Sequence, residues 1–525
     1  MLVTVREIVV KRRIFRQFNA LALRAGVAAL IAAGLGGCAL GPNFKSPAAP
    51  ATAGDSYTPT PLPQQTASAP GVGGTAQQFA FGQEIPAQWW SLFRSPALDQ
   101  LIRSALEQNP NMAAAEAVLR QAQENYNAQA GNLVYPSVNA QLGGGRQKVS
   151  AATAGAAAGV YNVYNASVNV AYTPDVFGGT RRTLEGAQAA VDYQRFQVEA
   201  TYLTLSANVV TTAIQEASLR AQLQATREVL DALTKQQNVI EKQFEFGAIP
   251  RTTVLSQRNQ VAQINATIAP LEKALAAARH QLSVLAGKLP GEAGMPEFTL
   301  ESLTLPQQLP VSLPSALVRQ RPDIRASEEA LHQASANIGV ATAAQYPQFS
   351  LTGSYGSSAT TFGKLFDSQT TAWSLLAGVA QPVFNGGALS AQRRAAEAAY
   401  DAASAQYRAT VLTAFQNVAD TLRALEADAA ALKSQAEAEA LAKETLDLSE
   451  QQYKLGGISY LVLLDAQRSY QQTHISLVQA QATRYADTAA LFQALGGGWW
   501  NRADGMSAAT AVSAAAQYGK DGKNQ

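Results

Sequence analysis

Residues 180–246, which begin TRRTLEG and end IEKQFEF, contain no proline and a single glycine, Gly186. At about 1.5 Å per residue, such a stretch would form a helix roughly 100 Å long, whereas helices in globular proteins usually have about 8–20 residues. Residues 388–455 contain neither proline nor glycine and predict a second helix of the same kind. A helix this long has to pack lengthwise against other long helices. The sequence therefore predicts a rod or tube of helices.

The sequence around these two stretches is nearly duplicated, about 209 residues apart. The matching runs are Tyr135-Pro136 with Tyr346-Pro347, Pro174-Asp175-Val176-Phe177-Gly178-Gly179 with Pro382-Val383-Phe384-Asn385-Gly386-Gly387, Phe246-Gly247-Ala248-Ile249 with Leu455-Gly456-Gly457-Ile458, and Leu285-Ala286-Gly287 with Leu495-Gly496-Gly497. Each copy reads as strand, strand, very long helix, short turn and long helix. The return helices are expected at residues 251–286 and 459–495, and Pro270 is expected to break or kink the first of them.

Runs of alternating polar and apolar residues come before the long helices, two in each copy. They lie at about residues 135–145, 163–173, 346–356 and 372–382. In the second run Tyr164, Val168 and Tyr172 fall on one face, and Asn165 and Asn169 fall on the other. Runs of about 10 such residues fit transmembrane β-strands, although an ordinary half-buried antiparallel sheet alternates in the same way. The neighbouring long helices favour the membrane interpretation.

Four strands in one chain are too few for a membrane barrel, because the smallest such barrels have about eight. An open sheet edge is not tolerated in hydrocarbon, where unpaired backbone groups find no water. If these strands cross a membrane, several copies of the chain must therefore share one barrel.

The N-terminus has the features of a bacterial lipoprotein signal. A basic region ends at Arg16, an apolar stretch of small residues covers residues 25–37, and Cys38 follows as the only cysteine of the chain. The apolar stretch is too short to span a bilayer. The run before Cys38 resembles a lipobox, in which the cysteine is acylated; the alternative is a free buried thiol. Residues 1–37 are thus expected to be a signal peptide, and residues 38–88 an extended, lipidated tether.

Composition excludes several function classes. Residues 1–37 carry six Lys/Arg and one Glu, a net +5, which leaves −3 for the rest of a chain of net +2. No basic patch indicates nucleic-acid binding. The single cysteine excludes a disulfide framework and a Cys-ligated zinc. His280, His332 and His474 have no ligand partner at i+4 and are expected to be structural. No nucleophile, acid/base pair or phosphate loop is found, so no catalytic residue, metal or cofactor is predicted.

Several motifs resemble those of TolC-like outer-membrane efflux proteins. The motifs are Trp89-Trp90-Ser91-Leu92-Phe93, Leu98-Asp99-Gln100-Leu101-Ile102, Arg321-Pro322-Asp323-Ile324-Arg325, Ala336-Asn337-Ile338-Gly339-Val340-Ala341 and Leu495-Gly496-Gly497-Gly498-Trp499. Together with the lipobox they resemble the lipoprotein branch that serves resistance-nodulation-division pumps. The resemblance covers roughly residues 89–500 and divides into a first repeat, 89–300, and a second, 301–500. Residues 501–525 are expected to be a disordered tail.

The resemblance implies a mainly α protein with a transmembrane β part. It implies a homotrimer in which a 12-stranded β-barrel in the outer membrane continues into a 12-helix α-barrel in the periplasm. It also implies outer-membrane lipid, a periplasmic adaptor protein and an inner-membrane pump as partners. The adaptor would contact the hairpin tips at Gly247, Ala248, Gly456 and Gly457, although the second tip lacks the basic residue found at some family tips.

The resemblance also implies a periplasmic gate just after the second tip. Leu461 and Asp465 are i, i+4 neighbours on one helix face, and they match the positions that constrict the closed channel in the family. Three copies would give an apolar ring and an acidic ring, and Arg468 matches a residue that pairs near this gate. The alternative is that Asp465 and Arg468 form a surface ion pair. The first copy has Ser256 in place of Asp465, so only one hairpin can supply the acidic ring.

The leading hypothesis is a passive outer-membrane exit duct for drugs or other small molecules in a tripartite efflux system. The same duct could instead serve a type I protein or peptide secretion system. A non-channel coiled-coil lipoprotein of the periplasm is a second class. A lipid-anchored periplasmic enzyme is a third, and it is disfavoured because no residue cluster supplies an acid, a base or a nucleophile.

Overall fold

The computed structural model describes residues 39–50, 56–150, 152 and 159–502. The predicted signal peptide, Cys38 and nearly all of the predicted tail lie outside the described residues. The chain divides into two compact units. Among the described residues, the strand unit comprises 39–46, 120–150, 152, 159–193 and 328–406, and the helical unit comprises 47–50, 56–119, 194–327 and 407–502.

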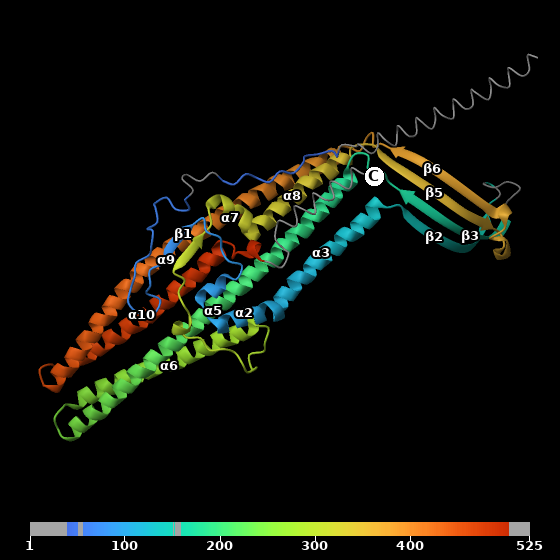
Figure 1. Ribbon diagram of the computed structural model, residues 1–525. Coiled ribbons are helices and arrows are strands. Elements are labelled where there is room, and N and C mark those ends of the chain that lie inside the picture. The colour runs from blue at the N-terminus through green and yellow to red at the C-terminus, as the bar shows by residue number, and fades with distance from the viewer. Residues whose placement is uncertain (1–38, 51–55, 151, 153–158, 503–525) are drawn as a thin grey trace, which may run out of the picture. The chain divides into compact units, whose positions relative to one another are not determined.

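The strand unit contains an antiparallel sheet of four strands in the order β2-β3-β5-β6 (Figure 1). The strands are β2 (Ser137–Val149), β3 (Gly159–Tyr172), β5 (Gln348–Ala359) and β6 (Thr371–Ala380). Val168 pairs with Tyr355, and Tyr355 pairs with Trp373, so one row of apolar side chains crosses the sheet. β2 and β6 are the edges, and each pairs with one neighbour only.

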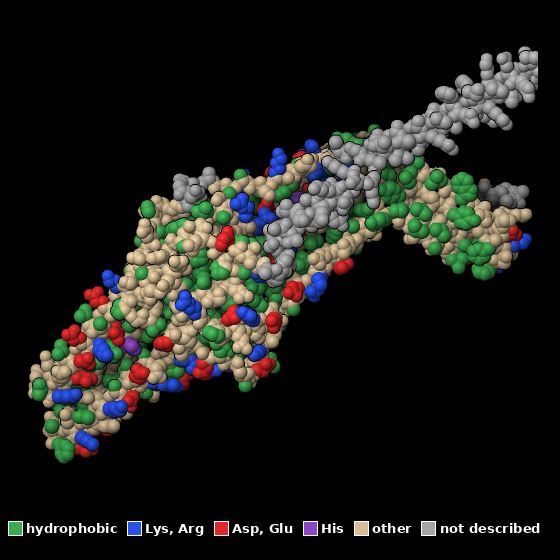
Figure 2. All heavy atoms as spheres, in the orientation of Figure 1, with side chains coloured by type: hydrophobic (Ala, Val, Ile, Leu, Met, Phe, Trp, Pro, Cys, Tyr) green, Lys and Arg blue, Asp and Glu red, His purple; other side chains and the backbone are tan. Residues whose placement is uncertain are grey.

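The sheet exposes large apolar side chains. Val138 and Leu142 on β2 are 64% and 69% exposed, and Trp373 and Leu375 on β6 are 75% and 77% exposed. Figure 2 shows apolar side chains gathered over the visible face of these strands. Monomeric soluble proteins rarely leave so much apolar surface uncovered, so the sheet is built to be covered by something other than water.

Four long helices carry most of the remaining residues. They are α5 (Gly179–Glu245, 67 residues), α6 (Arg251–Leu285, 35 residues), α9 (Ala388–Lys454, 67 residues) and α10 (Tyr460–Ala494, 35 residues). No helix of the described residues has the length and apolar character needed to cross a membrane. Of the break or kink expected at Pro270, the break is wrong, because α6 runs unbroken through this residue. Proline removes a single hydrogen bond of the ladder, and α6 keeps the rest.

Shorter helices that the sequence analysis did not identify precede the strands. They are α2 (Pro96–Gln108), α3 (Pro110–Val134), α7 (Pro314–Gln320) and α8 (Pro322–Ala343). Each begins at a proline, which is favoured at the first helical position because its fixed φ suits a helix and its missing N–H would be unpaired there anyway. The four long helices expected from the sequence are therefore those that follow each pair of strands, and the helices that precede the strands are additional.

The core of the helical unit forms around the Trp89 motif. Trp89 and Trp90 lie in a short 3-10 turn, η2 (Trp89–Phe93), and are 0% and 2% exposed. The Trp89 ring stacks on Phe492 with 5.4 Å between centroids. Trp90 Nε1 donates to Asp99 Oδ1 at 3.0 Å, so the two runs of this motif hold each other. Two short parallel strands, β1 (Gln78–Phe81) and β4 (Gln308–Val311), lie in the same unit.

The described part of the segment after residue 55 is bound to the helical unit rather than extending freely as a tether. Arg484 on α10 is fully buried and donates to Gly73 O, Thr75 O and Thr66 Oγ1, each at 2.8 Å. A buried guanidinium is stable only when its donors are paired. The three hydrogen bonds from Arg484 therefore hold the segment from Thr66 to Thr75 against α10.

Candidate functional site

The tips of the two helical hairpins lie at the same end of the helical unit (Figure 1). Gly247 and Gly456 have φ of +72° and +77°, the left-handed conformation that closes a helix at glycine. Ala248 N donates to Gln243 O at 2.9 Å, and Gly457 N donates to Gln452 O at 2.8 Å. The same cap thus ends both α5 and α9 at corresponding places.

The two tips present similar surfaces. All four residues predicted to meet an adaptor, Gly247, Ala248, Gly456 and Gly457, are exposed. Beside them Phe246 and Leu455 are both 86% exposed. Each tip therefore ends in a small-residue turn next to one large apolar side chain.

A small apolar cluster joins the hairpins behind the tips. Its buried members are Ile240, Val254, Tyr460, Leu463 and Leu464. The Tyr453 and Tyr460 rings meet edge to face at 5.9 Å. Burial raises the pKa of both tyrosines, so both hydroxyls stay protonated and available as donors at neutral pH.

Three hydrogen bonds link the second hairpin to glutamines of the first. Tyr453 Oη donates to Gln243 Oε1 at 3.3 Å. Arg468 Nε donates to Gln260 Oε1 at 2.7 Å, and the Tyr460 hydroxyl donates to Gln257 Oε1. Gln257 is fully buried, and its amide nitrogen donates to Leu233 O at 2.6 Å. These links fix how the two hairpins sit against each other.

Leu461 and Asp465 lie on the exposed face of α10. Leu461 is 67% exposed, and Asp465 is also exposed. Arg468 makes its hydrogen bond with Gln260, and the described residues show no ion pair between Arg468 and Asp465. The structure thus brings Arg468 to the first hairpin and leaves Leu461 and Asp465 side by side at the surface.

Sequence reasoning missed Tyr453, Tyr460 and the three glutamines. Glutamines on a long helix resemble any solvated residue, and each partner lies more than 200 residues away along the chain. The buried spacing of Tyr460, Leu463 and Leu464 at the start of α10 is the one local signal that a contact surface begins there.

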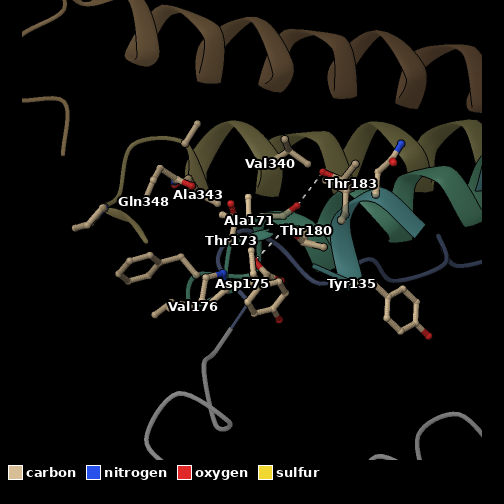
Figure 3. A pocket seen from close by; sticks show the side chains of 18 of the residues that line it. Tyr135, Ala171, Thr173, Asp175, Val176, Thr180, Thr183, Val340, Ala343 and Gln348 are labelled. Atoms are coloured by element: carbon tan, nitrogen blue, oxygen red, sulfur yellow. Dashed lines mark hydrogen bonds between the residues drawn. The ribbon is translucent and has the colours of Figure 1, made fainter. Parts of the chain in front are cut away.

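A cavity lies in the strand unit, where β3 leads into α5. It encloses about 500 Å³ and is lined by residues that include Tyr172, Thr173, Thr183, Val340 and Ala343 (Figure 3). Its carboxylate, Asp175, accepts hydrogen bonds from Thr180 N at 3.0 Å and Arg181 N at 2.9 Å. Asp175 therefore caps α5.

Two of the three histidines, His332 and His474, contact a carboxylate. His474 Nδ1 lies 3.0 Å from Glu439 Oε1, and His332 Nε2 lies 3.0 Å from Glu185 Oε1. Among the described residues no three His, Asp or Glu side chains gather in a way that would hold a metal ion.

A family model described as outer membrane efflux protein matches residues 101–288 and 313–497. The chain belongs to the outer membrane efflux protein family. The pyoverdine export outer membrane protein OpmQ of Pseudomonas putida is 31% identical over 447 residues, which cover 84% of this chain and 94% of that protein. The probable efflux pump outer membrane protein TtgC of Pseudomonas putida is 30% identical over 476 residues, or 89% of this chain and 94% of that protein.

Solved structures agree with this assignment. The outer-membrane channel OprN superposes with a TM-score of 0.79 at 26% identity, covering 88% of this chain and 100% of that one. The predicted resemblance and the predicted place in the outer membrane, with extension into the periplasm, are thereby confirmed. The relatives of this outer membrane efflux protein are named as channels and efflux proteins.

The Arg321-Pro322-Asp323-Ile324-Arg325 motif has a structural role here. Arg321 is buried and donates through Nη1 to Ala494 O, 2.9 Å away at the end of α10. Its Nε and Nη2 bind Asp323 at 3.0 and 2.7 Å. Trp499 Nε1 donates to Gln320 O at 2.6 Å. Arg321 thus ties the end of α10 to the start of α8.

Proposed function

We propose that three copies of this chain form one outer-membrane exit channel, closed by a gate at the hairpin tips. The observation that carries the proposal is the four-stranded sheet with two unpaired edges and exposed apolar side chains. In hydrocarbon each edge needs a partner. Edge β6 of one copy pairing with edge β2 of the next supplies it, and three copies give a barrel of 12 strands.

The lengths of the long helices support a duplicated chain. α5 and α9 each have 67 residues, and α6 and α10 each have 35. We infer that the two hairpins descend from one and that three copies surround the periplasmic lumen with 12 helices. The exposed Phe246 and Leu455 at the tips then offer six apolar contacts to a periplasmic adaptor, which connects the channel to an inner-membrane pump.

The gate follows from the exposed face of α10. Arg468 is bound to Gln260, and Asp465 lies exposed at the surface beside Leu461. Three such carboxylates in a ring attract cations, and three Leu461 side chains form an apolar constriction. Opening requires the two hairpins to separate, which breaks the links at Tyr453, Tyr460 and Arg468.

The cargo class comes from the relatives. OpmQ is named for pyoverdine export and TtgC for an efflux pump, so small organic molecules are the proposed cargo. The lipobox at Cys38 supplies the proposed acyl anchor, which adds to the membrane affinity of the barrel.

Conductance across a planar bilayer tests the channel. Purified protein should give discrete, cation-preferring conductance steps, because the narrowest ring is acidic. Protein that inserts into the bilayer and gives no steps at any voltage would contradict the channel and favour a structural lipoprotein. Cysteines placed on β2 and β6 should form disulfides between copies only when both edges carry one, which tests edge pairing separately.

A further inference from the structure

The first described residues of the chain lie in a fitted groove of the strand unit. Residues 39–46, called the strap below, read ALGPNFKS and contact α5, α8 and the turn before α5. Leu40 N donates to Phe177 O at 3.1 Å. A Cβ on Gly178 would lie 2.5 Å from Ala39 Cα, and a Cβ on Gly41 would lie 2.5 Å from Gly339 Cα. The strap therefore crosses the turn and α8 at two places where only glycine fits.

The turn beneath the strap is itself held in place. Asp175 caps the first turn of α5 through Thr180 N (Figure 3) and through Arg181 N. Gly178 has a φ of +80°, which favours glycine even without the contact to Ala39. The carbonyl of Phe177 and the bare Gly178 are thus a preformed floor for the strap.

Arg182 binds the strap with most of its donors. It is 4% exposed. Nε donates to Leu40 O at 3.1 Å, and Nη2 donates to Gly41 O at 3.3 Å and to Asn43 Oδ1 at 2.7 Å. Nη1 donates to Glu185 Oε2 at 2.6 Å. The strap therefore supplies three acceptors to a guanidinium that is buried in the complete structure, where donors need partners.

Aromatic and polar contacts hold the other end of the strap. The Phe44 ring stacks on His332 with 4.4 Å between centroids and 14° between planes. His332 is oriented by Glu185 Oε1 at 3.0 Å and Glu329 Oε2 at 3.3 Å. The Ser46 hydroxyl donates to the Glu328 carboxylate. One network therefore runs from Arg182 through Glu185 and His332 to Phe44.

We propose that Arg182, Glu185, His332, Gly178 and Gly339 form an intramolecular peptide-binding site for residues 39–46. The site recognises an extended peptide in which a glycine is followed, two and three residues later, by an asparagine and an aromatic residue. Fully extended and free, these eight residues would span at most about 28 Å. When the strap is bound, these residues cannot extend freely, so the residues that follow Cys38 are held at one place on the strand unit. The site is independent of the channel function and of acylation.

Trypsin cleavage after Lys45 in the full-length protein tests the site. Lys45 is exposed, but its neighbours Phe44 and Ser46 are both held. Cleavage needs local release of the strap, so it should be slow in the natural protein. R182A should speed it about tenfold or more, because charge-assisted hydrogen bonds to the strap are lost. Arg393 on α9 pairs with Glu397 and, among the described residues, makes no hydrogen bond or ion pair with the strap, so R393A is the matched control and should leave the rate unchanged.

Two further variants keep the test decisive. G41A leaves α5 and α8 intact and introduces a side chain against Gly339, so it should release the strap even if R182A fails to fold. C38A removes the acylated residue and should leave Lys45 protected. Equal cleavage in the natural protein, R182A and G41A would overturn the site. Loss of protection in C38A would also overturn it, since the acyl group would then be holding the strap. Bilayer conductance of the same samples reports on the channel separately.

Discussion

At the scale of single residues, the hairpin tips separate two neighbouring charges. Arg468 is bound to Gln260 on the other hairpin, while Asp465 stays at the surface beside Leu461. The charge that lines the proposed gate and the charge that holds the gate together therefore lie within one turn of α10. Substitutions at the two positions should have different effects, because one changes the aperture and the other changes the contact between hairpins.

Replacing Asp465 tests the lining of the gate. D465A removes side-chain volume and charge, so single-channel recording should show a larger conductance and weaker cation preference. D465N keeps nearly the same volume and should weaken cation preference with little change in conductance. Identical recordings for D465A and the natural protein would remove Asp465 from the gate.

Replacing Tyr460 tests the contact between hairpins. Y460F keeps the ring in the tip cluster but removes the donor to the fully buried Gln257. A buried acceptor left without a partner costs about 1–3 kcal/mol, which should shift the gate toward its open state by about fivefold or more. Open probability in single-channel recording measures this shift. Y126F, a substitution on α3, is the control, and an effect of equal size there would argue against a role for Tyr460.

The Asp428 carboxyl on α9 should make stability depend on pH. Burial, together with a hydrogen bond and the charge of Asp487, raises the pKa of Asp428 from 3.8 to about 7. The folded state then holds a proton that the unfolded state has lost, so stability falls as pH rises from about 4 to about 7. D428N should raise Tm at pH 8 and leave it unchanged at pH 4. A variant that gains nothing at pH 8 would show that Asp428 ionises without cost.

At the scale of elements, some parts of the fold could be predicted from local sequence and others could not. The absence of proline and glycine from residues 187–246 is a local signal, and α5 follows it closely. Pro110 and Pro322 are the first residues of α3 and α8, and they are the local sequence signal for where these two helices begin. Pro270 does not end α6, because one missing hydrogen bond does not end a packed helix.

The candidate site was predictable only in part. Leu461 and Asp465 could be placed on one face because i, i+4 spacing is a property of any helix. The partners Gln243, Gln257 and Gln260 could not be found, because the contact depends on how two distant hairpins align. The strap was missed for the same reason: Gly41 and Gly339 become meaningful only when the fold brings their backbones together.

Removing Arg321 tests how the end of α10 is fixed to α8. R321A leaves the carbonyl of Ala494 without the Arg321 donor, while Asp323 keeps the hydrogen bond from Ile324 N. Losing a charge-assisted hydrogen bond of this kind costs about 1.5–3 kcal/mol, so thermal unfolding should begin a few degrees lower. R319A, at an exposed position on α7, should leave Tm unchanged. Equal Tm values for R321A and R319A would show that this contact does not stabilise the fold.

At the scale of the whole molecule, the sheet alone makes the single chain incomplete. Two open edges and apolar side chains such as Trp373 and Leu375 cannot remain as they are in either water or lipid. The helical unit, by contrast, has a buried core built on Trp89, Phe93 and Phe492. The need for further copies of the chain is therefore argued from the strands, and the shared helical tube is part of the same proposal.

Native mass spectrometry of the full-length protein released from detergent micelles tests this requirement most directly. The account predicts a single species with three times the mass of one mature chain, dissociating to monomers only when the protein is heated or denatured. A folded, detergent-independent monomer as the main species would contradict it.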